Sequence, residues 1–180
     1  MASNNRGAVL CFTGNGKGKS TAAFGIALRA YGHGQNVCII QFIKSSDIVI
    51  GERETFKQLG IEMHQMGKGF TNKNEIEAHK EGIREAWALA KEKIMSNAYD
   101  VVILDEINNV FGIKRFDHRE VLTADMCMDC FKDRPERTNI ILTGRSAPDA
   151  LREYADLVTV CHEEKHYYQA GRQAIKGIDY

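Results

Sequence analysis

A glycine- and lysine-rich stretch near the N-terminus has the residue types and the spacing of a phosphate-binding loop. Its central part reads Gly16-Lys17-Gly18-Lys19-Ser20. Glycines let the backbone turn its N–H groups toward an anion, and a helix that begins here adds the positive end of its dipole. In such loops the lysine before the serine contacts phosphate oxygens, and the serine hydroxyl binds Mg²⁺. Lys19 and Ser20 are therefore predicted to bind the phosphates and the metal ion of a nucleoside triphosphate.

The loop departs from the Walker pattern at one position. The pattern has a glycine, four residues and then Gly-Lys-Ser/Thr, and here Thr13 stands at the first glycine. A flexible glycine turn with solvated lysines is the alternative interpretation. An apolar run over 8–12 precedes the loop and a helix-compatible stretch over 21–31 follows it, which favours phosphate binding. The candidate nucleotide-binding residues of this loop are Thr13, Gly14, Asn15, Gly16, Lys17, Gly18, Lys19, Ser20 and Thr21.

Two further candidates follow apolar runs later in the chain. Asp105 and Glu106 end the run 101–104, as in a Walker B motif. A carboxylate at the end of a buried strand can hold Mg²⁺ directly or through water. Acidic residues often follow strands, so this motif gains its weight from the upstream loop. Arg145 follows the run 139–143 and is either a contact to phosphate or substrate, or a surface arginine.

The elements that must position these residues alternate along the chain. Alternation of strands and helices indicates a single α/β domain over 1–180 with a mainly parallel central sheet. Ligands in such sheets bind beyond the carboxyl ends of the strands, where the candidates above are all expected. Strands are predicted over 8–12, 37–42, 61–66, 101–106, 139–143 and 157–161, and helices over 21–31, 52–59, 74–96, 118–132 and 148–154.

Composition narrows the class of protein. The 180 residues carry 24 Lys plus Arg and 24 Asp plus Glu, so no overall basic field favours nucleic acid or a membrane surface. The N-terminus lacks the apolar segment of a signal peptide, and no run approaches the length of a membrane span, which favours a cytoplasmic protein. The five cysteines, including the pair Cys127 and Cys130, are interpreted as reduced structural thiols because a metal site needs about four ligands.

The residues predict binding of a nucleoside triphosphate with Mg²⁺ but leave the reaction open. Hydrolysis, phosphate transfer to an acceptor, and use of triphosphate as a leaving group are all compatible with the loop. In the last case the loop and Mg²⁺ would stabilise charge on the departing oxygens.

Several segments, in order and over nearly the whole chain, resemble the ATP:corrinoid adenosyltransferases of bacterial cobalamin salvage. The threonine at the first Walker position is also that family's form. The segments that carry the resemblance are 13–25, Gln41-Phe42-Ile43-Lys44, Gly69-Phe70-Thr71, 104–106, Thr143-Gly144-Arg145, 155–159, 165–166, 170–171 and 176–178.

The resemblance implies a RecA-like, three-layer P-loop fold, a homodimer and a defined reaction. Co(I) of a reduced corrinoid attacks the 5′ carbon of ATP, and triphosphate leaves. Lys19 would neutralise the triphosphate, Ser20 and Glu106 would hold Mg²⁺ with Asp105 close by, and Phe70 would crowd the lower face of the corrin. Because cobalt is the nucleophile, no catalytic Ser, Cys or His is needed. A separate reductase would supply Co(I).

The sequence differs from the family on the corrinoid side. Asn72 stands where the family usually has a tryptophan that acts with the phenylalanine, and only about seven residues precede the first strand. We therefore expect weaker displacement of the lower ligand of the corrinoid. Two alternatives remain at this point: an ATPase or kinase on the same scaffold, and a module that binds and delivers an adenosylated corrinoid without efficient turnover.

Overall fold

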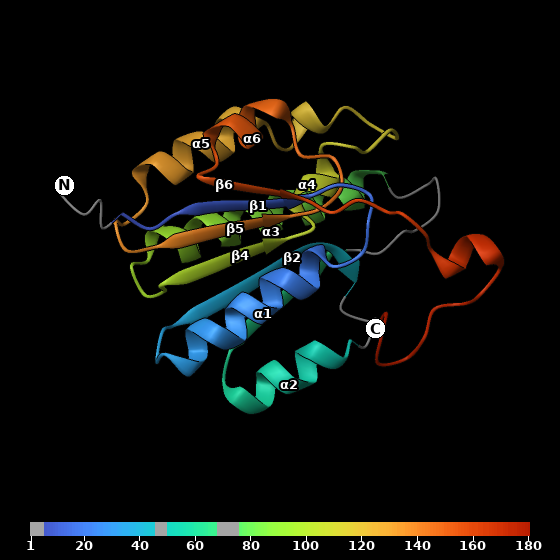
Figure 1. Ribbon diagram of the computed structural model, residues 1–180. Helices are drawn as coiled ribbons and strands as arrows, with labels where there is room; N and C mark the ends of the chain where they lie inside the picture. The colour runs from blue at the N-terminus through green and yellow to red at the C-terminus, as the bar shows by residue number, and fades with distance from the viewer. Residues whose placement is uncertain (1–5, 46–49, 68–75) are drawn as a thin grey trace.

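The computed structural model describes residues 6–45, 50–67 and 76–180. Six strands form one parallel sheet in the order β3-β2-β4-β5-β1-β6 (Figure 1). Every pairing of neighbouring strands is parallel, which confirms the predicted α/β class. The strands are β1 (Val9–Thr13), β2 (Val37–Ser45), β3 (Glu62–Gly67), β4 (Val101–Asp105), β5 (Asn139–Thr143) and β6 (Leu157–Val160).

Helices cover both faces of the sheet and make three layers. In Figure 1, α1 and α2 lie below the sheet, whereas α5 and α6 lie above it. The helices are α1 (Lys19–Gly32), α2 (Gly51–Leu59), α3 (Ile76–Met95), α4 (Ile107–Val110), α5 (Ala124–Asp133) and α6 (Asp149–Tyr154), with short 3₁₀ helices η1 (His118–Glu120) and η2 (Tyr167–Ala170). Among the described residues, none of the helices combines the length and apolar character that crossing a membrane requires.

Two apolar cores lie on opposite faces of the sheet because successive strand side chains point to opposite sides. On one face, Phe24 of α1 packs edge-on against Phe56 of α2, with ring centroids 5.4 Å apart. On the other face, Trp87 of α3 packs against Phe131 of α5. Burial of β1, β2, β4 and β5 on both faces explains why their sequences are largely apolar runs, whereas the edge strands β3 and β6 are more exposed.

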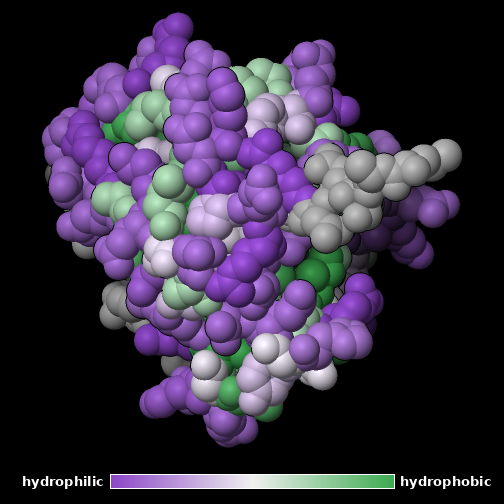
Figure 2. Space-filling view, turned by 90° about the vertical axis from the view of Figure 1, so that its left-hand side faces the viewer, coloured by the Kyte–Doolittle hydropathy of each residue, from purple (hydrophilic) through white to green (hydrophobic). Residues whose placement is uncertain are grey.

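The outer surface contrasts with these cores. On the face of the molecule that is at the left of Figure 1, apolar residues occur in small groups among hydrophilic ones (Figure 2). Such a mixture is usual for protein surface in contact with water. The candidate residues lie at the other end of the strands.

The predicted helix 118–132 is wrong over residues 118–123. A 3₁₀ turn ends at Glu120, and α5 begins only at Ala124. The reason is Thr123, whose backbone is extended and therefore not helical. Its side-chain hydroxyl caps α5 by accepting a hydrogen bond from Met126 N at 3.2 Å. The structure also extends β2 to Ser45, beyond the predicted strand 37–42, and adds α4 directly after Glu106.

Candidate functional site

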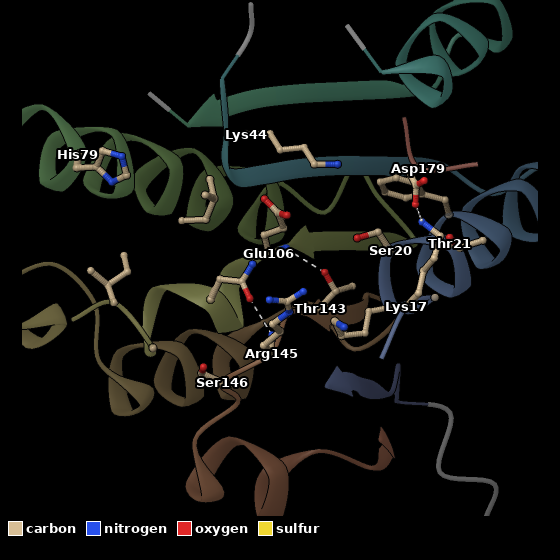
Figure 3. Close-up of a pocket in the computed structure, with 18 of the residues that line it drawn as sticks. Lys17, Ser20, Thr21, Lys44, His79, Glu106, Thr143, Arg145, Ser146 and Asp179 are labelled. Atoms are coloured by element: carbon tan, nitrogen blue, oxygen red, sulfur yellow. Dashed lines mark hydrogen bonds and ion pairs between the residues drawn. The ribbon is translucent and has the colours of Figure 1, made fainter. Parts of the chain in front are cut away.

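A cavity of about 790 Å³ lies at the carboxyl ends of the strands. This volume is within the range of sites that bind small molecules and cofactors. Figure 3 shows Lys44, Glu106 and Arg145 turned toward its middle, with Lys17 and Asp179 at one end. The cavity is thus built by segments that are far apart in the sequence, as the parallel sheet predicts.

The predicted phosphate-binding loop contributes its second half to the cavity. Of its candidates, the residues that line the cavity are Lys17, Gly18, Lys19, Ser20 and Thr21. The helix α1 begins at Lys19, and Gly18 stands before it with a φ of 111°. The backbone N–H groups of the first turn of a 14-residue helix are therefore directed to the cavity, which favours an anion there.

The first half of the loop has a packing role in the structure. Gly16 N donates to Cys161 O at 2.8 Å, and a Cβ at Gly16 would lie 2.4 Å from His162 O. Gly14 has a φ of 97°. Thr13 is buried and donates to Arg145 O at 3.0 Å. The loop therefore lies directly against the chain after β6, and Thr13 connects it to the segment after β5.

Lys19 is held inside the loop. Its ammonium donates to Gly16 O at 2.5 Å. Burial lowers the pKa of Lys19 below its usual value, and Arg145 lowers it further, although nearby acidic groups oppose this. The side chain is thus a partly desolvated cation whose charge becomes more favourable when an anion enters the cavity.

The two predicted acidic residues have different environments. Asp105 is fully buried, and its carboxylate accepts from Gln41 Nε2 at 2.7 Å and from Thr143 Oγ1 at 2.6 Å. Glu106 lines the cavity instead. Its backbone has a φ of 64°, and its N–H donates to the same Thr143 hydroxyl at 2.9 Å. One threonine hydroxyl therefore connects both acidic residues, and the strained backbone turns Glu106 away from the strand.

The Glu106 carboxyl is poorly compensated by hydrogen bonds. Its Oε2 atom is buried without a hydrogen-bond partner. Burial, and after it the charge of Asp105, raise the pKa of Glu106 to about 7, while Lys44 and Arg145 act in the opposite direction. A cation bound at this oxygen would stabilise the ionised form.

Thr143→Val tests the hydroxyl that connects the acidic residues. The substitution leaves a buried carboxylate oxygen and an N–H group without this partner, so the free energy of unfolding should fall by about 2 kcal/mol. ATP binding should weaken because Glu106 loses its support. Urea unfolding and ATP titration measure both effects. Thr143→Ser keeps the hydroxyl and should retain both properties, and equal behaviour of the two variants would argue against the bridge.

The structure places most predicted residues together but reveals others that sequence reasoning missed. Arg145 lines the cavity, so it does not lie on a remote surface. Asn15 is exposed and outside the cavity lining, and Phe70 falls outside the described residues. Lys44, Thr143 and Asp179 line the cavity without having been assigned a role. The first two belong to family-like segments, which was the available signal.

One other group in the described part of the chain brings possible metal ligands together. Cys38, Glu62 and His64 place one ligand atom each within 4.8 Å of the others. The Glu62 carboxylate already pairs with His64 Nε2 at 2.5 Å, Lys93 Nζ at 2.8 Å and the Tyr99 hydroxyl. Burial raises the pKa of Cys38 to about 12. Because the Glu62 carboxylate already has these three partners and the Lys93 ammonium would repel a metal ion, we interpret the group as an ion-pair network.

Comparison with known proteins gives consistent matches over the full chain. A family model described as ATP:corrinoid adenosyltransferase BtuR/CobO/CobP matches residues 5–180. The corrinoid adenosyltransferase of Escherichia coli K12 is 38% identical over 181 residues, covering 100% of this chain and 89% of that protein. Corrinoid adenosyltransferase CobA of Salmonella typhimurium is 37% identical with the same coverage, and the Pseudomonas aeruginosa protein is 35% identical, covering 100% and 87%.

A solved structure supports the fold alone. The KaiC-like protein PH0186 of Pyrococcus horikoshii superposes with a TM-score of 0.53 at 19% identity, covering 89% of this chain and 75% of that one. Together with the parallel sheet and its two helical layers, this likeness confirms the expected RecA-like P-loop architecture.

Proposed function

Because this chain belongs to the ATP:corrinoid adenosyltransferase family, we propose that its cavity at the carboxyl ends of the strands is where ATP binds and reacts. The chain is a transferase that adenosylates corrinoids with ATP, in cobalamin synthesis or salvage. The observation that supports this location best is the convergence of a helix N-terminus, Lys19, Ser20 and Glu106 on one cavity. These are the groups that triphosphate and its metal ion require.

The reaction assigns a simple task to the protein. The electron pair of Co(I) forms the bond to C5′. The bond from C5′ to the triphosphate oxygen breaks, and triphosphate departs with the electron pair of that broken C–O bond. Negative charge therefore grows on the departing oxygen. Lys19, Lys44 and Arg145 line the same cavity, and fixed cations at such a position lower the barrier more than mobile water does.

Mg²⁺ fits the donor set of the cavity. Mg²⁺ prefers oxygen ligands and is commonly bound by one or two protein groups together with phosphates and water. The Ser20 hydroxyl and the unpartnered Glu106 Oε2 are such oxygens. Asp105 has both carboxylate oxygens engaged by Gln41 and Thr143. We therefore assign it the role of orienting the Thr143 hydroxyl, which accepts a hydrogen bond from the Glu106 backbone. Bound Mg²⁺ would screen the charges of the triphosphate.

The reaction is tested by anaerobic incubation with ATP, Mg²⁺ and chemically reduced cobinamide. Absorbance follows the cobalt–carbon product, and chromatography identifies the phosphate products. Adenosylated corrinoid and triphosphate in equal amounts are expected. ADP or single phosphate without a cobalt–carbon product would instead indicate an ATPase or kinase. Binding of both substrates with little turnover would indicate the delivery module.

Asn72→Trp tests the corrinoid side of the proposal. Phe70 and Asn72 lie outside the described residues, so their roles rest on the family pattern. An amide excludes water less well than an indole ring. The wild type should therefore adenosylate cobinamide several-fold faster than cobalamin, and Asn72→Trp should narrow that ratio. Asn74→Trp adds the same ring two residues later and serves as control. Equal wild-type rates on both corrinoids would contradict the argument.

The wider setting of the enzyme extends the same proposal. We expect one domain over residues 1–180, a homodimer, a cytoplasmic location and a separate reductase that supplies Co(I). Light scattering of the purified protein tests the dimer. Dependence of turnover on an added electron donor, when no chemical reductant is present, tests the need for a reductase.

A further inference from the structure

The chain after β6 returns to the phosphate-binding loop at two places. Directly after β6, Cys161 O accepts a hydrogen bond from Gly16 N at 2.8 Å. At the other end of the segment, Asp179 Oδ1 accepts from Lys17 Nζ at 2.6 Å. Figure 3 shows this second contact at one end of the cavity, beside Thr21. The loop is therefore held between the start and the end of the C-terminal segment.

The carboxylate of Asp179 is a point where several parts of the chain meet. The Oδ1 atom accepts from Lys17. The Oδ2 atom accepts from Ile175 N at 2.7 Å and from the Tyr167 hydroxyl. The Ile175 N–H, and after it Lys17 and Tyr167, hold the pKa of the Asp179 carboxyl well below its usual range. The Asp179 side chain is only 15% exposed. Three donors on a poorly exposed carboxylate make a defined geometry, unlike an ordinary surface ion pair.

A tight turn presents this carboxylate to the cavity. Gly177 has a φ of 80°, a conformation that favours glycine. Asp179 N donates to Ile175 O at 2.8 Å, and Gly177 N donates to Tyr180 O at 2.8 Å. The turn places Ile178 and Asp179 in the cavity lining. Ile178 is 62% exposed, so an apolar side chain is available to a ligand at this wall.

Asp179 contacts Lys17 and not Lys19. It therefore does not compete with the phosphates for the Lys19 ammonium. Lys19 Nζ bonds within the loop, to Gly16 O, whereas Lys17 Nζ bonds to the C-terminal segment. The Lys17 side chain is 43% exposed. The two lysines thus have different partners: Lys19 contacts its own loop, and Lys17 contacts the C-terminal segment.

Building on the ATP site proposed above, we propose that Asp179 is a positioning residue for ATP. It binds Lys17 and thereby holds residues 175–180 as a wall of the nucleotide cavity. Loss of this contact weakens ATP binding, whereas the corrinoid is handled as before. If Asp179 instead neutralised Lys17 and kept it from the phosphates, the change in ATP affinity would have the opposite sign. Removal of the Asp179 charge would then free Lys17 and tighten ATP binding.

Calorimetric titration with Mg-ATP in the absence of corrinoid tests the proposal. Asp179→Asn should raise the ATP Kd about fivefold, and Asp179→Glu should restore most of the affinity because it keeps the carboxylate. Glu164→Gln removes the same charge from an exposed position of the C-terminal segment outside the cavity lining, and should leave the Kd unchanged. An unchanged or lower Kd for Asp179→Asn overturns the proposal.

A double-mutant cycle separates the contact from a general loss of order in the segment. Lys17→Ala and Asp179→Asn should each raise the Kd about fivefold, and the double variant should be no weaker than either. If the two fold-increases in Kd multiply in the double variant, Lys17 and Asp179 act independently and the proposal is overturned. Steady-state rates add a second readout: the KM for ATP should rise while kcat and the KM for cobinamide stay near wild type. Failure of the wild type to adenosylate cobinamide would instead overturn the proposed function, since the titration needs no turnover.

Discussion

Lys19→Ala is expected to lower the rate of adenosyl transfer about a hundredfold. The reason is the charge that grows on the departing triphosphate oxygen. Lys19 is a partly buried cation at the start of α1, and loss of one fixed donor at a developing oxyanion costs about a hundredfold or more. Initial rates with reduced cobinamide at saturating ATP measure the effect on turnover, and calorimetry measures the accompanying loss of ATP affinity.

Lys17→Ala is the matched comparison for this first prediction. It removes the same charge from the same loop, two residues earlier. Because Lys17 contacts Asp179 and not the interior of the loop, its loss should act on the KM for ATP and leave kcat near wild type. If Lys19→Ala kept more than half of the wild-type kcat, the assigned role of Lys19 would be wrong.

Glu106→Gln is expected to lower turnover about a hundredfold while making the metal-free protein more stable. The amide is a weaker Mg²⁺ ligand than the carboxylate, so the metal contribution to catalysis is lost. In the native protein, burial and Asp105 raise the pKa of Glu106 to about 7. The ionised carboxylate is therefore unfavourable above pH 7, and the neutral amide removes that cost.

The sign of the stability effect follows from proton linkage. The pKa of Glu106 is higher in the native state than in the unfolded state, so between these two pKa values the native state binds more protons. Wild-type stability therefore falls as pH rises from the unfolded pKa to the native one. At pH 8 in a chelator, Glu106→Gln should exceed the wild type by about 2 kcal/mol in urea unfolding. At pH 4 the two should be nearly equal. A variant that loses both activity and stability would show instead that Glu106 acts mainly in packing.

Sequence reasoning recovered the fold because its signals are local. The buried strands are continuous apolar runs, and the loop before α1 has its lysine and serine at fixed spacing. The break before α5 is not evident from the sequence because Thr123, a capping residue, lies within a helix-compatible pattern. The helix α4 was missed because it depends on the left-handed backbone of Glu106, which the residue type does not favour.

The candidate site was recovered only in part, for a different reason. The loop and Glu106 carry motif signals, whereas the contribution of Thr143 depends on strand order. That order places β5 beside β4, which brings the Thr143 hydroxyl to both acidic residues. The contact between Lys17 and Asp179 joins positions 162 residues apart. No spacing rule predicts such a contact within a polar C-terminal segment.

The position of β1 in the sheet has a consequence for how the protein is made. This strand carries the phosphate-binding loop, yet its two neighbours are β5 and β6, from the last quarter of the chain. During synthesis β1 emerges before both of these neighbours and has no native strand partner until β5 and β6 have followed. Pairings of such high sequence separation form slowly. Nucleotide binding by the nascent chain is therefore expected only after β5 and β6 have been made, and until then the apolar strand β1 is a segment prone to aggregation.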